Sequence, residues 1–145
     1  MRTVALDVGS KTIGVAVSDR LGMTAQRVTT VKRAGLAVDL ARLVKLFSEL
    51  EAQRVLVGLP LALKGEMGPQ AKKVLQFVEA MKEETNLPVV LWDERFSTVA
   101  AEKILLEADL SRSRRKKLRD ELAAVLILQS YLDSQWSGNI GHEES

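Results

Sequence analysis

Apolar residues open the chain in short runs separated by polar and glycine-containing breaks, a pattern that predicts β-strands. Two strands are expected at Arg2–Leu6 and Thr12–Ser18, with Gly9–Lys11 as the turn between them. A third strand, Met23–Val31, carries enough polar residues to leave one face in water. Because the connections are short, these three strands can pair as an antiparallel meander.

From Leu36 the apolar spacing changes to the three- and four-residue intervals of an amphipathic helix. A second helix is expected after the flexible loop Gly65–Gln70, and Ser97 or Thr98 can cap a third helix that runs to about Glu107. Two strands stand between the helices, the first of them buried, and a last helix follows a basic loop. These segments are Arg54–Gly58 and Leu87–Trp92 for the strands, and about Lys117 to Trp136 for the last helix.

The order of these segments predicts an α/β fold. A strand that is reached through a helix usually lies parallel to the strand before it, so the two later strands should run parallel to the first. We therefore expect a five-stranded mixed sheet, with three antiparallel strands followed by two parallel ones and helices on both faces. A single domain should span residues 1–136, and residues 137–145 should form a flexible tail.

Composition excludes several classes of function. The chain of 145 residues has no cysteine, which excludes disulfides, thiolate metal sites and cysteine nucleophiles. Its one histidine, His142, lies in the expected tail, which argues against a serine–histidine triad or a histidine-rich zinc site. No apolar run approaches the ~20 residues of a membrane helix, so we expect a cytoplasmic protein with no membrane partner. The net charge of +2 is too small to indicate a polyanionic partner by itself.

One carboxylate, Asp7, follows a strand that should be buried. A lone carboxylate is costly to bury, so it is normally paired, hydrogen-bonded or bound to a cation. Two interpretations stay open from this residue alone. Asp7 caps the turn at Gly9, or it is a ligand at the strand end.

A second acid, Glu94, follows the carboxyl end of the strand Leu87–Trp92. Sites in open α/β sheets gather beyond the carboxyl ends of parallel strands, so Asp7 and Glu94 converge if their strands are parallel neighbours. Asp93 should point the other way, because side chains alternate along a strand. The alternative is a solvated strand end in which Glu94 is paired with Arg95.

A third acid, Asp120, comes one turn before the strongly apolar part of the last helix. It shares a helix face with Ala123, Ala124, Ile127 and Tyr131, and the two alanines allow a close approach to the sheet. Asp120 should therefore point inward at the helix start. The alternative is an acid that serves only the helix dipole.

Three inward carboxylates would repel one another and take up protons unless a cation lies between them. Magnesium prefers oxygen ligands, and it commonly combines one or two carboxylates with water and substrate phosphates. A pair of such ions can activate a water and stabilise the leaving oxygen in phosphodiester cleavage. We therefore expect Asp7, Glu94 and Asp120 to be the metal ligands and catalytic residues of a hydrolase that forms no covalent intermediate.

A run of positive side chains stands immediately before Asp120 and indicates an anionic partner. Backbone phosphates are the natural partner, and a solvated loop is the alternative. Few aromatic residues are free for base stacking, so we expect contacts to phosphates and to nucleic-acid shape. Lys11 and Arg95 are further candidates for phosphate contacts. The basic run consists of Arg112, Arg114, Arg115, Lys116, Lys117 and Arg119.

Four stretches carry a resemblance to a known family: ALDVGSKTIGVAVSD, VLVGLPL, DERFST and DELAAVLILQSYLD, in this order. Together they resemble the YqgF/RuvX family of ribonuclease H-like nucleases, from Arg2 to about Leu132. The resemblance implies a ribonuclease H-like fold and an acidic triad of Asp7, Glu94 and Asp120 that binds Mg²⁺ or Mn²⁺. It also implies one of two activities, maturation of the 5′ end of the 16S ribosomal RNA precursor or cleavage of Holliday junctions.

Two positions depart from the pattern of that family. Leu61–Gly65 stands where an asparagine and then an acidic or amide residue often precede the glycine, which puts a substrate role of this loop in doubt. Glu121 replaces a common serine after the last acid, and its charge could loosen phosphate binding or alter metal preference.

Three functions from different classes remain. The first is a metal-dependent nuclease that processes pre-16S rRNA in ribosome biogenesis or resolves four-way DNA junctions. The second is a catalytically silent nucleic-acid-binding module, against which the presence of all three acids argues. The third is an ATP-using phosphotransferase, which needs a second similar domain for which 145 residues leave no room. RNA and DNA both stay open as substrates, as do a ribosomal partner and a homodimer, which symmetric junction cutting favours.

Overall fold

The computed structural model describes residues 1–97 and 111–144, with residues 137–144 described by their backbone alone. Its strands are β1 (Thr3–Val8), β2 (Thr12–Ser18), β3 (Ala25–Lys32), β4 (Arg54–Leu59) and β5 (Val89–Asp93). Its helices are α1 (Leu36–Glu49), α2 (Pro69–Glu84) and α4 (Arg112–Glu144). Within the described part of the chain, no helix combines the length and the apolarity needed to cross a membrane.

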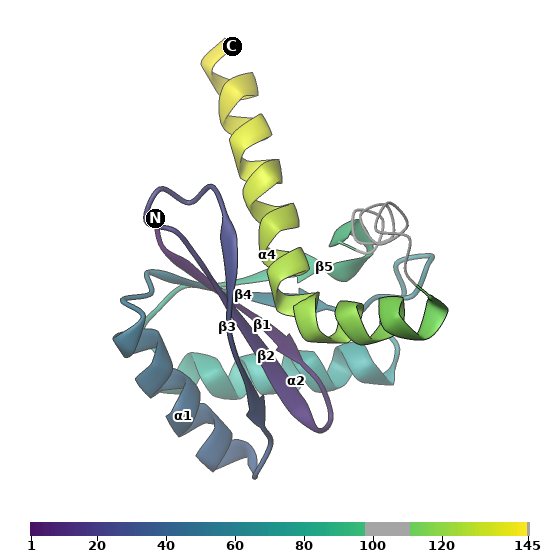
Figure 1. Cartoon of the computed structure of the whole chain (residues 1–145). Helices are drawn as coiled ribbons and strands as arrows, with labels where there is room; N and C mark the ends of the chain where they lie inside the picture. The colour runs from purple at the N-terminus through teal and green to yellow at the C-terminus, as the bar shows by residue number, and fades with distance from the viewer. Residues whose placement is uncertain (98–110, 145) are drawn as a thin grey trace.

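The five strands form one mixed sheet in the order β3-β2-β1-β4-β5 (Figure 1). The first three strands pair antiparallel, and β4 and β5 add parallel to β1. The predicted topology is therefore confirmed. β3 is an edge strand with many exposed residues, as its polar sequence predicts. β1 extends to Val8, beyond its predicted end at Leu6, and this extension places Asp7 inside a strand.

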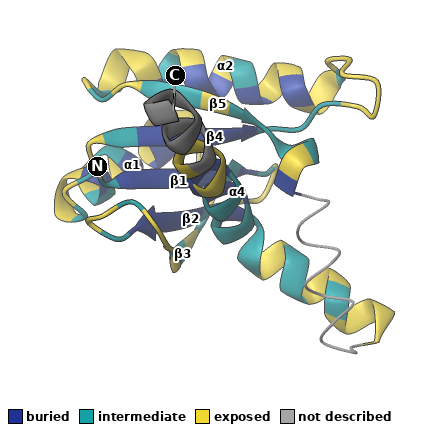
Figure 2. Cartoon of the chain, turned by 90° about the horizontal axis from the view of Figure 1, so that it is seen from above, coloured by how far each residue is buried: buried dark blue, intermediate teal, exposed yellow. Residues whose placement is uncertain are grey.

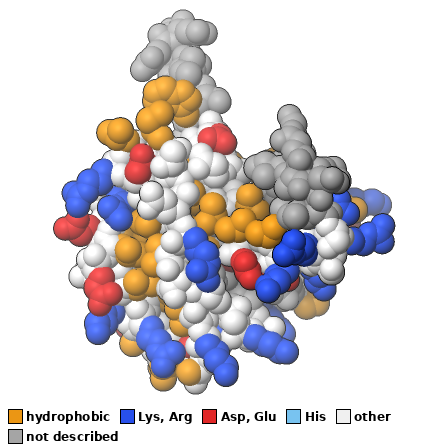
Figure 3. Space-filling model, viewed as in Figure 1, with side chains coloured by type: hydrophobic (Ala, Val, Ile, Leu, Met, Phe, Trp, Pro, Cys, Tyr) orange, Lys and Arg blue, Asp and Glu red, His pale blue; other side chains and the backbone are white. Residues whose placement is uncertain are grey.

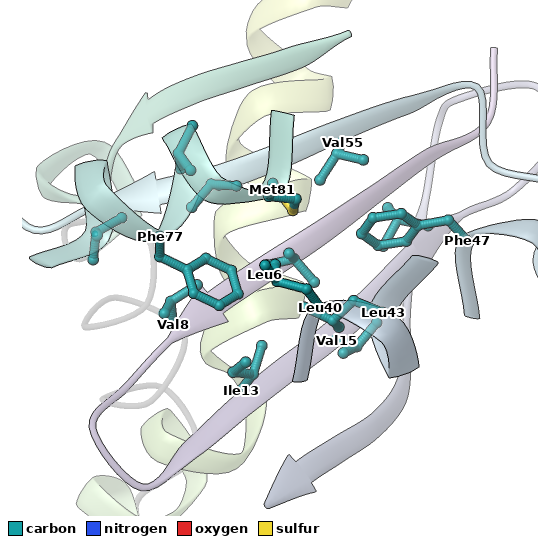
Figure 4. Close-up of a cluster of buried hydrophobic side chains, with 14 of the residues drawn as sticks. Leu6, Val8, Ile13, Val15, Leu40, Leu43, Phe47, Val55, Phe77 and Met81 are labelled. Carbon is teal, nitrogen blue, oxygen red and sulfur yellow. The ribbon is translucent and has the colours of Figure 1, made fainter. Parts of the chain in front are cut away.

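Helices α1 and α2 cover one face of the sheet and enclose the larger hydrophobic layer (Figure 4). Leu6 and Val8 of β1 point into this layer, where Leu40 and Leu43 of α1 and Phe77 of α2 meet them. Since side chains alternate along a strand, Ala5 and Asp7 lie on the opposite face of the sheet. Asp7 therefore faces away from the larger core.

Helix α4 covers that opposite face and packs closely over the middle of the sheet (Figure 2). The sheet offers it small side chains, Ala5 and Ala16, and α4 in turn presents Ala124. A Cβ added at Gly14 of β2 would lie 3.6 Å from the Cβ of Ala124, an ordinary contact distance. The predicted close approach of the last helix is confirmed.

The last helix begins earlier than predicted. α4 starts at Arg112, so the prediction of a basic loop before the helix is wrong. Ser111 explains the difference, because its hydroxyl accepts the N–H of Arg114 at 3.3 Å and its carbonyl accepts the N–H of Arg115 at 2.9 Å. Lysine and arginine are also good helix formers. α4 continues past Trp136 to Glu144, and the flexibility of residues 137–145 stays a prediction.

A helical turn also begins earlier than predicted after β5. Residues 94–97 are helical, and Asp93 caps them by accepting the N–H of Arg95 at 3.0 Å. Ser97 is therefore not the cap, and that prediction is wrong. The alternative cap Thr98 and the predicted course of this helix to Glu107 lie outside the described residues.

A buried carboxylate, Asp39, fixes the connection between β3 and α1. Its oxygens accept hydrogen bonds from Arg33 at 3.2 Å and from the N–H of Ala34 at 2.9 Å. Arg33 also donates to the carbonyl of Gly9 at 3.1 Å, which ties this connection to the turn after β1. Burial alone would raise the pKa of Asp39, but the hydrogen bonds from Ala34 and Arg33 outweigh it and lower that pKa.

Replacing Asp39 with asparagine should lower the free energy of unfolding by about 1–3 kcal/mol at neutral pH, because Arg33 loses its charged partner. The folded pKa of Asp39 is depressed, so its stabilisation is complete above the unfolded pKa of about 4 and is lost as pH falls through the folded value. Urea unfolding of both proteins at about pH 7 and about pH 3 measures this. The difference in free energy of unfolding between wild type and Asp39→Asn should be smaller at about pH 3 than at about pH 7.

Glu49→Gln is the matched control, since it removes an exposed partner of Lys45 and should change stability by less than about 0.5 kcal/mol. A difference between wild type and Asp39→Asn that stays the same at both pH values would contradict the ionic origin of the effect.

Candidate active site

The three predicted acids line one cavity at the carboxyl ends of the parallel strands. This acidic cavity has a volume of about 230 Å³ and receives Asp7 from β1, Glu94 from the end of β5 and Asp120 from α4. Its other lining residues are Ser97, Arg119, Ala123, Leu126 and Ile127. The structure therefore brings together residues that are far apart in the sequence, as predicted.

Asp7 points into the acidic cavity from within β1. It pairs in register with Gly14 of β2. The turn that follows is closed by the backbone, with the N–H of Gly9 donating to the carbonyl of Thr12 at 2.9 Å. The geometry therefore favours a ligand at this position over a turn cap.

Glu94 is the first residue of the helical turn after β5, and its carboxyl group hydrogen-bonds Asp7. Arg95 does not take Glu94 as its partner but pairs with Asp93, with 2.9 Å between Nε and Oδ2. The alternative in which Glu94 pairs with Arg95 is therefore excluded, and Asp93 points away from the acidic cavity as strand alternation predicts.

A residue that sequence reasoning missed, Gly58, allows this meeting of carboxylates. β1 and β5 are not neighbours, because β4 lies between them. A Cβ at Gly58 of β4 would lie 2.7 Å from Oε1 of Glu94 and 2.7 Å from Cδ1 of Ile127. Glu94 therefore reaches toward Asp7 across a strand position that has no side chain. A glycine inside a buried strand marks such close approaches and was the available signal.

The carboxylates oppose one another's ionisation, as predicted from their crowding. Burial raises the pKa of Glu94 to about 7, and the charge of Asp7 and the hydrogen bond with Asp7 add to this increase. Burial also raises the pKa of Asp7; the hydrogen bond from Glu94 lowers it, and the charge of Asp120 raises it further. Below about pH 7, Glu94 therefore holds a proton that it can donate to Asp7.

Asp120 lies differently from the prediction. It is the ninth residue of α4 rather than at the helix start, and it is exposed although it lines the cavity. In the described ranges, no group of three or more acidic, histidine or cysteine side chains has the spacing of a formed metal site. The half-buried pair, Asp7 and Glu94, nevertheless fits a divalent cation, because two carboxylates that repel each other gain from a cation between them.

The raised pKa of Glu94 predicts that metal affinity depends on pH. A cation must displace the proton of Glu94, so affinity for Mg²⁺ should rise between about pH 6 and about pH 8 and level off above. Calorimetric titration of the metal-free protein across this range measures it. Glu94→Gln should bind more weakly and with a flatter pH dependence. An affinity in the wild type that does not change with pH would contradict the assignment of Glu94 as a ligand.

The predicted basic residues fall on two faces of α4. Arg112, Arg115, Lys116 and Arg119 follow three- and four-residue spacing and form one basic stripe. Arg119 lines the acidic cavity, so the stripe leads into it. On the face of the molecule in Figure 3, Lys and Arg side chains surround a few acidic ones. The neighbouring face of α4 presents Arg114, Lys117 and Glu121, which line a separate hollow.

The two remaining basic candidates lie in different surroundings. Lys11 is exposed in the turn between β1 and β2. Arg95 is engaged with Asp93 and with the carbonyl of Leu63. Their contacts with phosphate, like those of the residues on α4, stay predictions.

Comparison with known proteins agrees with this geometry. The family model "RuvX: Holliday junction resolvase" matches residues 1–134. A protein of Desulforamulus reducens named "Putative pre-16S rRNA nuclease" is 53% identical over 134 residues, which are 92% of this chain and 98% of that protein. A protein of the same name from Clostridioides difficile is 54% identical over 132 residues, 91% of this chain and 94% of its own.

Solved structures confirm the fold. RuvC of T. thermophilus in complex with a Holliday junction substrate superposes with a TM-score of 0.64 at 15% identity, over 94% of this chain and 96% of that one. A second structure of Thermus thermophilus RuvC gives a TM-score of 0.58 at 14% identity, with 94% and 97% of the two chains covered. The predicted ribonuclease H-like architecture is thus confirmed, and by the match over residues 1–134 the chain belongs to the RuvX family.

Proposed function

We propose that this protein is a metal-dependent nuclease that hydrolyses phosphodiester bonds at the acidic cavity. The observation that carries the proposal is the hydrogen-bonded Asp7–Glu94 pair, half-buried beside Asp120 at the carboxyl ends of β1 and β5. Such a pair is costly without a cation and suited to one. Membership of the RuvX family and the names of the relatives support the same conclusion.

Asp7, Glu94 and Asp120 are the residues that would hold Mg²⁺ or Mn²⁺. Bound there, the metal supplies positive charge to the scissile phosphate and acidifies a water, and three carboxylates offer enough oxygen atoms for two ions. The side chains of the protein orient the site and bind the substrate. Asp7 and Glu94 orient the site from the carboxyl ends of β1 and β5, and the basic stripe binds the phosphates on either side of the scissile one.

The substrate that we favour is the 5′ end of the 16S ribosomal RNA precursor. Relatives that are 53% and 54% identical to this chain are named for pre-16S rRNA. The second candidate is the four-way DNA junction, which the family description and the likeness to junction-bound RuvC favour. Symmetric cutting of a junction would require a homodimer, whereas trimming of RNA could instead depend on a ribosomal partner.

The deciding experiment compares three labelled substrates side by side: a precursor 5′ fragment, a four-way DNA junction and a linear duplex of the same sequence. Each is incubated with Mg²⁺, with Mn²⁺ or with EDTA. Cuts confined to the RNA support the favoured substrate, and paired symmetric cuts in the junction alone support the second. Binding without cutting in any metal, also when ribosomal particles are added, would show a catalytically silent module and would overturn the proposal.

The basic stripe predicts a specific dependence of binding on salt. Replacing Arg112, Arg115 and Lys116 with glutamine should reduce the slope of log affinity against log salt by about 2–3, because each lost phosphate contact contributes roughly 0.7–0.9. Fluorescence anisotropy with a catalytically blocked substrate measures this. The matched control removes the same charge elsewhere, at Arg20, Lys45 and Lys82, which form exposed ion pairs. Equal slopes for both triple variants would contradict the stripe.

A further inference from the structure

Arg95 uses its guanidinium group in contacts with its own chain, although its side chain is 36% exposed. Nε lies 3.0 Å and 2.9 Å from the two carboxylate oxygens of Asp93, and Nη2 lies 2.5 Å from Oδ2. Nη1 donates to the carbonyl oxygen of Leu63 at 3.0 Å. Each of the three nitrogens therefore has an acceptor, and Asp93 neutralises the charge that a phosphate would otherwise meet.

Asp93 in turn fixes the backbone that carries Glu94. Its Oδ1 accepts the N–H of Arg95 at 3.0 Å, which is the N-cap contact of the helical turn 94–97. On the C-terminal side of Glu94, the hydroxyl of Ser97 donates a hydrogen bond to the Glu94 carbonyl oxygen at 2.8 Å. The position of Glu94 thus depends on the side chain that Arg95 holds.

The other contact of Arg95 is with the loop between β4 and α2, residues 60–68. A tight turn inside this loop is closed by two backbone bonds, from Gly65 to Ala62 at 2.8 Å and from Ala62 to Glu66 at 3.0 Å. Leu63 at its tip is 94% exposed, so packing supports the turn little. A Cβ at Gly65, where φ is +86°, would lie 3.5 Å from Nη1 of Arg95. Arg95 therefore ties an exposed loop to the end of β5.

We infer that Asp93 and Arg95 are a positioning pair, which orients Glu94 toward Asp7 and holds the 60–68 loop beside β5, and that Arg95 is not a phosphate ligand. Only the planar, forked guanidinium can reach the Asp93 carboxylate and the Leu63 carbonyl together. The inference rests on the proposed nuclease function for its kinetic test, whereas its structural test needs the fold alone.

The kinetic test uses Arg95→Gln, Asp93→Asn, their double variant and Arg95→Lys. Single-turnover cleavage at saturating substrate should fall by about 10–100-fold in Arg95→Gln, with affinity within about twofold and an unchanged salt slope. Asp93→Asn should lose a similar factor, and the double variant should lose no more, because both changes break one contact. Arg95→Lys should recover only part of the rate. Arg20→Gln, which breaks the exposed Arg20–Glu51 pair, is the control and should behave as wild type.

The structural test is hydrogen exchange on the metal-free protein. In Arg95→Gln, amides in residues 61–66 and 95–97 should exchange about tenfold faster, and in Arg20→Gln they should not change. Unchanged exchange would overturn the inference. So would weaker binding with a salt slope reduced by roughly 0.7–0.9 at an unchanged saturating rate, the behaviour of a phosphate ligand. If the wild type cuts no substrate, the nuclease proposal fails and the exchange result still decides the role of Arg95.

Discussion

Replacing Asp7 with asparagine is expected to reduce cleavage by on the order of 10³-fold or more, while the protein stays folded. Asp7 meets Glu94 directly and lies close enough to Asp120 for its charge to raise the Asp7 pKa, so it is the shared member of the three acids. Asparagine keeps the shape of the side chain and removes the negative charge that a cation requires. Cleavage in Mg²⁺ and in Mn²⁺, measured at saturating substrate, tests this.

A stability measurement separates lost chemistry from lost fold. The pKa of Glu94 is raised in the folded state, so the folded metal-free protein loses stability as pH rises through about 7. Asp7→Asn removes the repulsion that contributes to this increase, so in EDTA the variant should be at least as stable as wild type at about pH 8. Thermal unfolding with EDTA measures it. Retained cleavage by a folded Asp7→Asn protein would show that the acidic triad is misassigned.

Gly58→Ala is the second change with a large expected effect. The new methyl group would lie 2.7 Å from Oε1 of Glu94, too close for any real contact, so the carboxylate must move. A displacement of about 1 Å in a catalytic group can cost on the order of 10²-fold in rate, and we expect a loss of that size. The clash with Cδ1 of Ile127, also at 2.7 Å, should lower the free energy of unfolding by about 1–3 kcal/mol.

The matched control is Gly14→Ala, another glycine in a central strand of the same sheet. Its added Cβ would lie 3.6 Å from its nearest neighbours, Ala124 and Asp7, at ordinary contact distances. Cleavage should therefore change by less than about threefold, and stability by less than about 1 kcal/mol. Equal losses of rate and stability in both variants would show that any glycine in these strands is equally sensitive to substitution, and that the space for Glu94 is not the reason. A full rate in Gly58→Ala would show that Glu94 needs no such space.

The topology of the sheet could be predicted because each rule it uses is local. Short connections pair the first three strands, and helical crossovers make the last two parallel to β1. The three acids could also be predicted, because each interrupts an apolar pattern at the end of a strand or at the start of an apolar helix face. Ser111 carried a readable capping signal, and its omission misplaced the start of α4.

The role of Gly58 could not be predicted from spacing, because it depends on the order of strands in space. Sequence reasoning expected Asp7 and Glu94 to converge on condition that their strands are parallel neighbours, whereas β4 lies between those strands. Because β4 lies between β1 and β5, the missing side chain of Gly58 leaves the space that the Glu94 carboxylate occupies. In the same way, the partner of Arg95 could not be predicted from the sequence, because Asp93 and Glu94 both come just before it and only the backbone geometry decides between them.

The close packing of α4 over Ala5, Ala16 and Leu56 has a consequence for synthesis on the ribosome. All five strands leave the ribosome before this helix does, and a domain generally folds as a unit. Until α4 emerges, the sheet exposes that apolar face to water, and the cavity lacks Asp120 and its basic stripe. A partly synthesised chain can therefore hold two of the acids without being able to cut. We therefore expect nuclease activity only after the final helix covers the sheet.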